Sequence, residues 1–212
     1  MDVAHPIRSV IPSLDGPVLV VLAGTTHPLT TLEVHRLAGI GSSNGVRGVV
    51  ERLAEHGVAL ADHRGNAIYY TANRDHLAWS AVEILARLRL ALRERLAAEI
   101  GAWPISPIHA SMFGSAARAD GDASSDIDIL LVKGDLSAAD EEKWDEQVEG
   151  LQARVVALTG NRCQPFVVTT GRLREHVRAR DKLVDAWLRD GVRLVGDDLA
   201  AVVASLPAEG IG

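Results

Sequence analysis

Residues 113–132 constrain the fold more than any other part of the sequence, because a glycine-serine turn and a pair of aspartates lie close together there. Gly114 and Ser115 follow a short apolar run, and Asp126 and Asp128 lead directly into a hydrophobic segment that predicts a buried strand. Side chains alternate along a strand, so both aspartates should project from one face. Adjacent carboxylates repel each other unless a cation lies between them, and a hard divalent ion such as Mg²⁺ or Mn²⁺ is the usual partner.

The glycine-serine turn has the composition of a phosphate-binding loop. Gly114 lets the backbone approach a bound group closely, and a helix that begins at Ser115 would point its first N–H groups and its positive dipole end at an anion. A phosphate-binding turn beside a carboxylate pair is the apparatus of metal-assisted phosphoryl or nucleotidyl transfer.

The combined pattern resembles the signature of the nucleotidyltransferase superfamily related to DNA polymerase β, and more narrowly the minimal nucleotidyltransferases. The features that carry the resemblance are Gly114-Ser115, a gap of ten residues, and Asp126-x-Asp128 before hydrophobic residues. It covers roughly residues 85–195. An isolated Asp-x-Asp would be a weak signal, but here the pair, the gap and the strand that follows all agree.

The resemblance implies a site for a nucleoside triphosphate (NTP). Asp126 and Asp128 would be the catalytic metal ligands, and Gly114 and Ser115 would hold the β- and γ-phosphates. By similarity to the Gly-Ser-x-Ala-Arg form of the motif, Arg118 would hold nucleotide phosphates or pair with the acids. A salt bridge from Arg118 to a neighbouring carboxylate, Asp120 or Asp122, is an equally open interpretation.

The third strand of this block departs from the family pattern. Active members usually carry a third carboxylate there, whereas the corresponding residue is Gln164. Glutamine cannot act as a base and is a poor Mg²⁺ ligand. Three interpretations remain open: the enzyme is slow or recruits another acid such as Asp120 or Asp122, it binds a nucleotide without turning it over, or the expected strand register is wrong by a few residues.

The first seventy-five residues predict a winged helix-turn-helix domain. Helices are expected over 14–22, 30–37 and 43–56, and a hairpin over 58–70. Thr30 and Glu33 form a capping-box pattern, and Ser42 or Ser43 can cap the third helix. The segment resembles the winged helices of bacterial transcription regulators. This resemblance implies that the third helix enters the major groove of double-stranded DNA and that the wing contacts the backbone or minor groove.

Four residues of this segment are the candidate DNA contacts: Asn44 and Arg47 for base edges, and Ser43 and Arg64 for phosphates. Winged helices also serve as protein-docking or dimerisation modules, so that use stays open. The net charge of −6 argues against indiscriminate nucleic-acid binding. The histidines of this segment, His27, His35, His56 and His63, are not spaced as metal ligands.

The remaining segments predict an α+β chain with domains over 1–75 and 104–212, joined by a connecting helix over 76–103. Residues 74–100 contain almost no glycine or proline and carry a leucine stripe, which predicts one long helix or two abutting helices and a candidate homodimer element. Further elements are expected as a helix over 138–158, a strand over 163–168, helices over 171–178 and 183–188, and a strand over 192–195. The tail after Pro207 is expected to be loose. The basic residues that follow the third strand, Arg172 to Lys182, are either a nucleic-acid contact or a solvated helix face.

Composition sets the compartment. The single cysteine, Cys163, excludes an internal disulfide and fits a reducing cytoplasm. The N-terminus lacks signal-peptide features, and no apolar run is long enough to span a bilayer. We therefore expect a cytoplasmic Mg²⁺-dependent nucleotidyltransferase with a DNA-binding winged helix and no membrane partner. The acceptor, whether nucleic acid, protein or small molecule, stays open. The alternatives are a DNA-binding regulator with a degenerate nucleotide-sensing domain and a metal-dependent nuclease.

Overall fold

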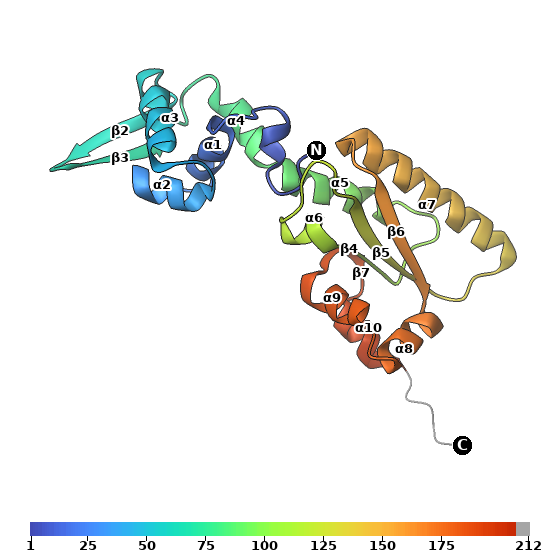
Figure 1. The fold of residues 1–212 in the computed structure, drawn as a ribbon. Helices are drawn as coiled ribbons and strands as arrows, with labels where there is room; N and C mark the ends of the chain where they lie inside the picture. The colour runs from blue at the N-terminus through green and yellow to red at the C-terminus, as the bar shows by residue number, and fades with distance from the viewer. Residues whose placement is uncertain (207–212) are drawn as a thin grey trace. The chain divides into compact units, whose positions relative to one another are not determined.

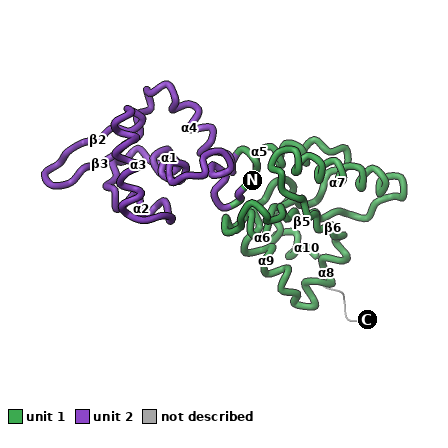
Figure 2. Tube along the Cα trace, turned by 45° about the horizontal axis from the view of Figure 1, so that its top comes forward, with its two compact units in different colours: residues 1, 3, 91–212 green, residues 2, 4–90 purple. Residues whose placement is uncertain are grey.

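A computed structural model describes residues 1–206 of the chain, which has the expected α+β architecture. The described residues contain two small sheets flanked by helices (Figure 1). The chain divides into two compact units within the helix that follows Arg87: residues 4–90 with Asp2 form one, and the chain from Ala91 onward with Met1 and Val3 forms the other (Figure 2). The expected loose tail after Pro207 lies outside the described residues.

The N-terminal unit has the element order of a winged helix. After a 3₁₀ turn come α1 Asp15–Ala23, β1 Leu29–Thr30, α2 Thr31–Ala38, α3 Ser43–Glu55, β2 Ala59–Arg64 and β3 Ala67–Ala72. The three strands form an antiparallel sheet in the order β1-β3-β2. The predicted three helices and hairpin are confirmed. The two-residue strand β1, which pairs with β3, was not predicted.

Local capping explains where the helices of this unit begin. The Thr30 hydroxyl accepts from the Glu33 backbone N–H at 3.3 Å, and the Glu33 carboxylate accepts from the Thr30 N–H at 2.8 Å, so the predicted capping box is present. Ser42 caps α3 by accepting from the Gly45 N–H at 3.1 Å. The apolar face of α3 is buried as its spacing predicts, through Val46, Val49, Val50 and Leu53.

The connecting segment forms two helices, α4 Trp79–Ala86 and α5 Leu88–Gly101. The first begins five residues after the predicted start at Arg74, which lies outside the helix. Its guanidinium pairs with Glu83 and donates to the Ala23 carbonyl at 3.1 Å.

The C-terminal unit is built on a four-stranded sheet in the order β6-β5-β4-β7. Strands β5 and β6 are parallel, and the other pairs are antiparallel. The elements are β4 His109–Phe113, α6 Gly114–Arg118, β5 Ile127–Lys133, α7 Ala138–Thr159, β6 Cys163–Thr169, α8 Thr170–Arg178, α9 Lys182–Asp190, β7 Val192–Gly196 and α10 Leu199–Ser205. The predicted strands and helices are confirmed, and α10 was not predicted.

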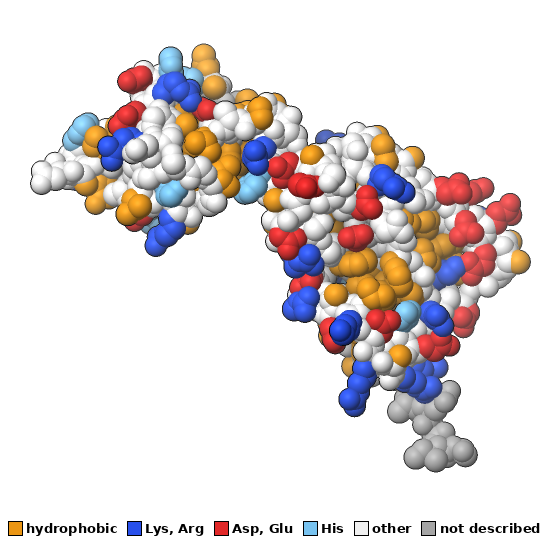
Figure 3. Space-filling view, viewed as in Figure 1, with side chains coloured by type: hydrophobic (Ala, Val, Ile, Leu, Met, Phe, Trp, Pro, Cys, Tyr) orange, Lys and Arg blue, Asp and Glu red, His pale blue; other side chains and the backbone are white. Residues whose placement is uncertain are grey.

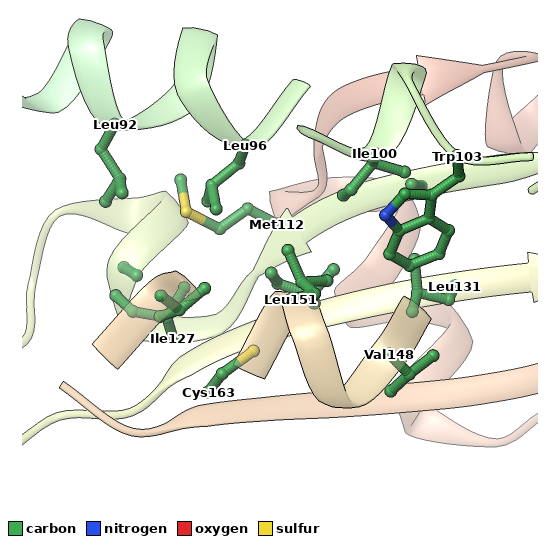
Figure 4. Packing of buried hydrophobic residues seen from close by; sticks show 14 of the residues in the cluster. Leu92, Leu96, Ile100, Trp103, Met112, Ile127, Leu131, Val148, Leu151 and Cys163 are labelled. Carbon is green, nitrogen blue, oxygen red and sulfur yellow. The ribbon is translucent and has the colours of Figure 1, made fainter. Parts of the chain in front are cut away.

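Strand β5 is buried on both faces, which explains its continuous run of aliphatic residues. Ile127, Ile129 and Leu131 face one core, which α5 and α7 cover. Figure 4 shows leucines of both helices directed at this face. Leu130 and Val132 face a second core that contains side chains of α8, α9 and α10. Asp128 lies on the second face, at the end where this core stops.

Candidate active site

The backbone of Gly114 lies against the carboxylate of Asp128. Phe113 pairs with Asp128 across β4 and β5, so the chain turns into α6 beside that aspartate. Gly114 has a φ of +69°, and a Cβ built on it would lie 2.3 Å from Asp128 Oδ2. Any side chain at this position would therefore displace the carboxylate, in addition to straining the backbone. The sequence predicted that the Gly114 backbone approaches a bound group, and the close approach in the structure is to the Asp128 carboxylate.

The carboxylates of Asp126 and Asp128 lie near enough for their negative charges to repel each other. Asp126 directly precedes β5, and both residues are half-buried. Burial raises the pKa of Asp128, the negative charge of Asp126 raises it further, and Arg118 opposes the rise. Burial and the same two carboxylates raise the pKa of the Cys163 thiol to about 12. A divalent cation would relieve this accumulation of negative charge.

Gln164 occupies the position next to Asp128 in the sheet. The parallel pairing of β5 and β6 places Asp128 opposite Gln164 and Leu130 opposite Phe166. Registered residues of neighbouring strands point to the same face, so the Gln164 amide and the Asp128 carboxylate lie side by side. The pairing places Gln164 beside Asp128, on the strand that was predicted to carry it. The residue beside Asp128 on β6 is therefore an exposed amide and not a carboxylate.

The loop between α6 and β5 folds back over Ser115. A Cβ built on Gly121 would lie 2.5 Å from Ser125 Oγ and 2.9 Å from Ser115 Oγ. Asp122 accepts from the Ser124 N–H at 2.8 Å, and the buried Asn161 amide donates to the Ser125 carbonyl at 2.9 Å. These bonds fix the loop that delivers Asp126. Asn161 is a supporting residue that the sequence did not single out.

Arg118 is held by two carboxylates, one of which the sequence predicted. Its Nε donates to Asp120 Oδ2 at 2.8 Å, which is one of the expected salt bridges, while no salt bridge to Asp122 is found among the described residues. Its Nη1 donates to Asp190 Oδ2 at 3.1 Å. Asp190 lies at the end of α9, its side chain is only 7% exposed, and Arg189 and Arg118 lower its pKa to about 2. Nothing in the sequence connects Asp190 with Arg118, because 72 residues separate them.

Asp126 and Asp128 could bind a hard cation, although they would supply only a few of its ligands. Two carboxylates supply oxygen, which Mg²⁺ and Mn²⁺ prefer. Within residues 1–206 there is no cluster of three or more histidine, cysteine, aspartate or glutamate side chains arranged to hold a metal. An ion shared by Asp126 and Asp128 would therefore complete its shell with phosphate oxygens and water, as Mg²⁺ commonly does.

The candidate DNA contacts all lie on the surface of the N-terminal unit. Ser43, Asn44 and Arg47 are exposed on the first turns of α3. Arg64 is exposed at the end of β2, donates to Asp62 at 2.7 Å and lies over the Tyr69 ring at 5.1 Å. Residues 1–90 contain eight arginines and eight carboxylates, so the whole net charge lies in the remainder of the chain.

Charge and hydrophobic side chains are distributed unevenly on the C-terminal unit. Figure 3 shows hydrophobic side chains gathered in the middle of its viewed face, with acidic side chains above them and along the right edge, and with basic and acidic ones mixed below. No helix among residues 1–206 is both long and apolar enough to cross a bilayer. Comparison with protein-family models, with curated proteins and with solved structures finds no match to this chain.

Proposed function

We propose that the C-terminal unit is a metal-dependent nucleotidyltransferase that moves a nucleotidyl group from an NTP to an acceptor hydroxyl. The observation that carries this proposal is the contact between the Gly114 backbone and the Asp128 carboxylate, beside Asp126. A glycine turn that requires the absence of a side chain, packed against one of two mutually repelling acids, is costly as pure structure. It is expected where a polyphosphate and a cation must be held together.

In this proposal the residues bind and orient the triphosphate. Asp126 and Asp128 would hold Mg²⁺ or Mn²⁺, which supplies neutralisation of charge on the nonbridging and leaving oxygens. The Gly114 backbone and the Ser115 hydroxyl hold the β- and γ-phosphates. Arg118 is oriented by Asp120 and Asp190 and sits at the end of α6, where it contributes positive charge to the same anion. Attack by the acceptor oxygen at the α-phosphorus forms one P–O bond and breaks the bond to pyrophosphate.

A transfer assay tests this function directly. The purified protein is incubated with labelled NTPs, Mg²⁺ or Mn²⁺, and candidate acceptors that include single-stranded DNA, single-stranded RNA and the protein itself. Label transfer by the wild type that is lost in Asp128→Ala supports the proposal. Asp135→Ala is the matched control, because Asp135 is an exposed aspartate beyond the end of β5. Shortening of the nucleic acid would instead support a nuclease, and nucleotide binding without transfer would support a sensor.

The N-terminal unit favours a second activity, binding to double-stranded DNA. Its helix order and three-stranded sheet are those of a winged helix, and Ser43, Asn44 and Arg47 are exposed at the start of α3, where that fold meets the major groove. With eight positive and eight negative side chains in residues 1–90, the unit would depend on a few placed contacts rather than on general attraction. A mobility-shift titration at several salt concentrations tests this activity.

A further inference from the structure

The first residues of the sequence pack against the loop that delivers Asp126. Met1 and Val3 are part of the C-terminal unit. The Val3 side chain is buried in the core cluster that also contains side chains of α5, β5 and α7. The Val3 backbone N–H donates to the Asp122 carbonyl at 3.5 Å, so this residue contacts the loop between α6 and β5 directly.

Gly121 of this loop lies between Val3 and the serine that is proposed to hold phosphate. A Cβ built on Gly121 would lie 2.7 Å from Val3 Cγ2. The same atom would lie 2.9 Å from Ser115 Oγ and 2.5 Å from Ser125 Oγ. These distances are shorter than van der Waals contact, so there is no room for a methyl group between the side chains. The position of Val3 therefore limits how the loop can lie over Ser115.

The side chain of Asn161 joins Met1 to the same loop. Its Nδ2 donates to the Met1 carbonyl at 3.1 Å and to the Ser125 carbonyl at 2.9 Å. Its Oδ1 accepts from the Met1 nitrogen at 2.6 Å. Asn161 is buried, and a buried amide holds its partners firmly because a hydrogen bond left unmade there is costly. One side chain therefore fixes Met1 and the backbone carbonyl directly before Asp126.

We propose that Met1 and Val3 are positioning residues of the transferase site. This inference rests on the proposed function. Both residues act through the loop, without contact to the ion or the triphosphate. Packing by Val3 and the bonds between Met1 and Asn161 keep the Asp126 carboxylate at the metal and the loop in place over Ser115. Supporting contacts of this kind set the affinity of a site, because the groups that bind must be held in the productive geometry.

The affinity for Mn²⁺ added with a non-hydrolysable NTP analogue separates positioning from packing of the core. Val3→Ala should weaken this binding about 10-fold and lower kcat/KM for transfer by a similar factor. Val148→Ala is the matched control, because Val148 is a buried valine of the same core cluster, on α7 (Figure 4). It removes the same two methyl groups and should lower the melting temperature without changing the affinity.

A second variant, Gly121→Ala, tests the same arrangement from the side of the loop. Gly121 does not have a positive φ, so alanine brings no strain of the backbone there. Its methyl group would displace the Ser115 hydroxyl or the Val3 side chain, and binding of Mn²⁺ with the analogue should again weaken about 10-fold. This variant decides the question if Val3→Ala does not fold.

The contradicting outcomes separate this inference from the function on which it rests. Wild-type affinity for Mn²⁺ and the analogue in folded Val3→Ala would overturn the inference and leave the transferase standing. An equal loss of affinity in Val148→Ala would do the same, because the effect would then follow any cavity in the core. If the wild type does not bind Mn²⁺ with the analogue, both proposals are overturned.

Discussion

The two units differ in how their candidate residues are held. In the C-terminal unit three of them are fixed by neighbours: Gly114 by contact with Asp128, Arg118 by Asp120 and Asp190, and Asp126 by the bonded loop before it. In the N-terminal unit, Ser43, Asn44 and Arg47 are exposed residues on a well-capped helix. The first arrangement is that of a preorganised site. The second is an exposed helix surface of a kind that binds DNA in some proteins and other proteins elsewhere.

This difference determines what a substitution in each unit should change. A substitution at a constrained position should disturb geometry, stability and activity together, because the same contacts support all three. A substitution at an exposed position should change binding alone. The two kinds of outcome can be tested independently, in one chain, with matched controls.

The largest effect is expected at Gly114. Gly114→Ala places a methyl group 2.3 Å from Asp128 Oδ2 at a φ of +69°, so we expect transfer to be abolished. The free energy of unfolding should also fall, by about 2 kcal/mol. Gly150→Ala is the control, because Gly150 lies inside α7 and no atom lies within 4 Å of a Cβ built on it. Its free energy of unfolding should rise by about 0.5 kcal/mol. Denaturant titration measures the stability of the variants, and the transfer assay measures their activity. An active and stable Gly114→Ala variant would contradict the claim that the site needs a glycine at this position.

A clear effect on binding, without one on stability, is expected at Arg47. Arg47→Ala should weaken binding to duplex DNA by about 1–3 kcal/mol if the side chain contacts a base, and should leave the melting temperature unchanged. Arg36→Ala removes an exposed arginine from the last turn of α2 and should change affinity less. If both variants bind as the wild type does, or if the wild type shows no salt-dependent binding, the exposed face of α3 serves another partner.

Asp190 offers a pH test of the Arg118 arrangement. Its pKa of about 2 lies below the ordinary value, so its contribution to stability is present above about pH 4. The contribution is lost as the pH falls toward 2. Asp190→Asn should lower the melting temperature at pH 7, and the difference from the wild type should shrink in acid. Asp185→Asn, at an exposed position on the same helix, should show little change at either pH. A pH-independent deficit would mean that Arg118 is not held by this charge.

The smallest effect on stability is expected at Asp128, where the substitution should stabilise the protein rather than destabilise it. Its pKa is raised in the folded protein, so ionisation opposes folding above the ordinary carboxyl pKa, and the penalty is complete above the folded pKa. Asp128→Asn should therefore be more stable than the wild type at pH 7, by less than about 1 kcal/mol. The two proteins should converge near pH 3. Mn²⁺ added together with a non-hydrolysable NTP analogue should stabilise only the wild type. A destabilised Asp128→Asn without metal would contradict the repulsion between the two acids.

Much of the architecture could be predicted because its signals are local. Thr30 with Glu33 marks the start of α2, and the apolar spacing from Val46 to Leu53 defines the buried face of α3. The alternation around Asp128, with the aliphatic run after it, placed the central strand. The motif predicted that Gly114 accompanies the acids, and the fold brings its backbone against one of them.

The remaining features depend on contacts between distant segments. Strand β1 has two residues and exists only because β3 pairs with it. The Asp190 carboxylate reaches Arg118 because α9 packs beside α6, a contact that periodicity does not reveal. The interruption at Arg87 between α4 and α5 has no glycine or proline to signal it.

Binding of Mn²⁺ in the presence of a non-hydrolysable NTP analogue tests the central claim most directly. Electron paramagnetic resonance can follow free Mn²⁺ during titration of the wild type, Asp126→Asn, Asp128→Asn and the control Asp135→Asn. The account predicts nucleotide-dependent Mn²⁺ binding by the wild type and by Asp135→Asn, and its loss in both site variants. Equal Mn²⁺ binding by all four proteins, or by none of them, would contradict a metal held by Asp126 and Asp128.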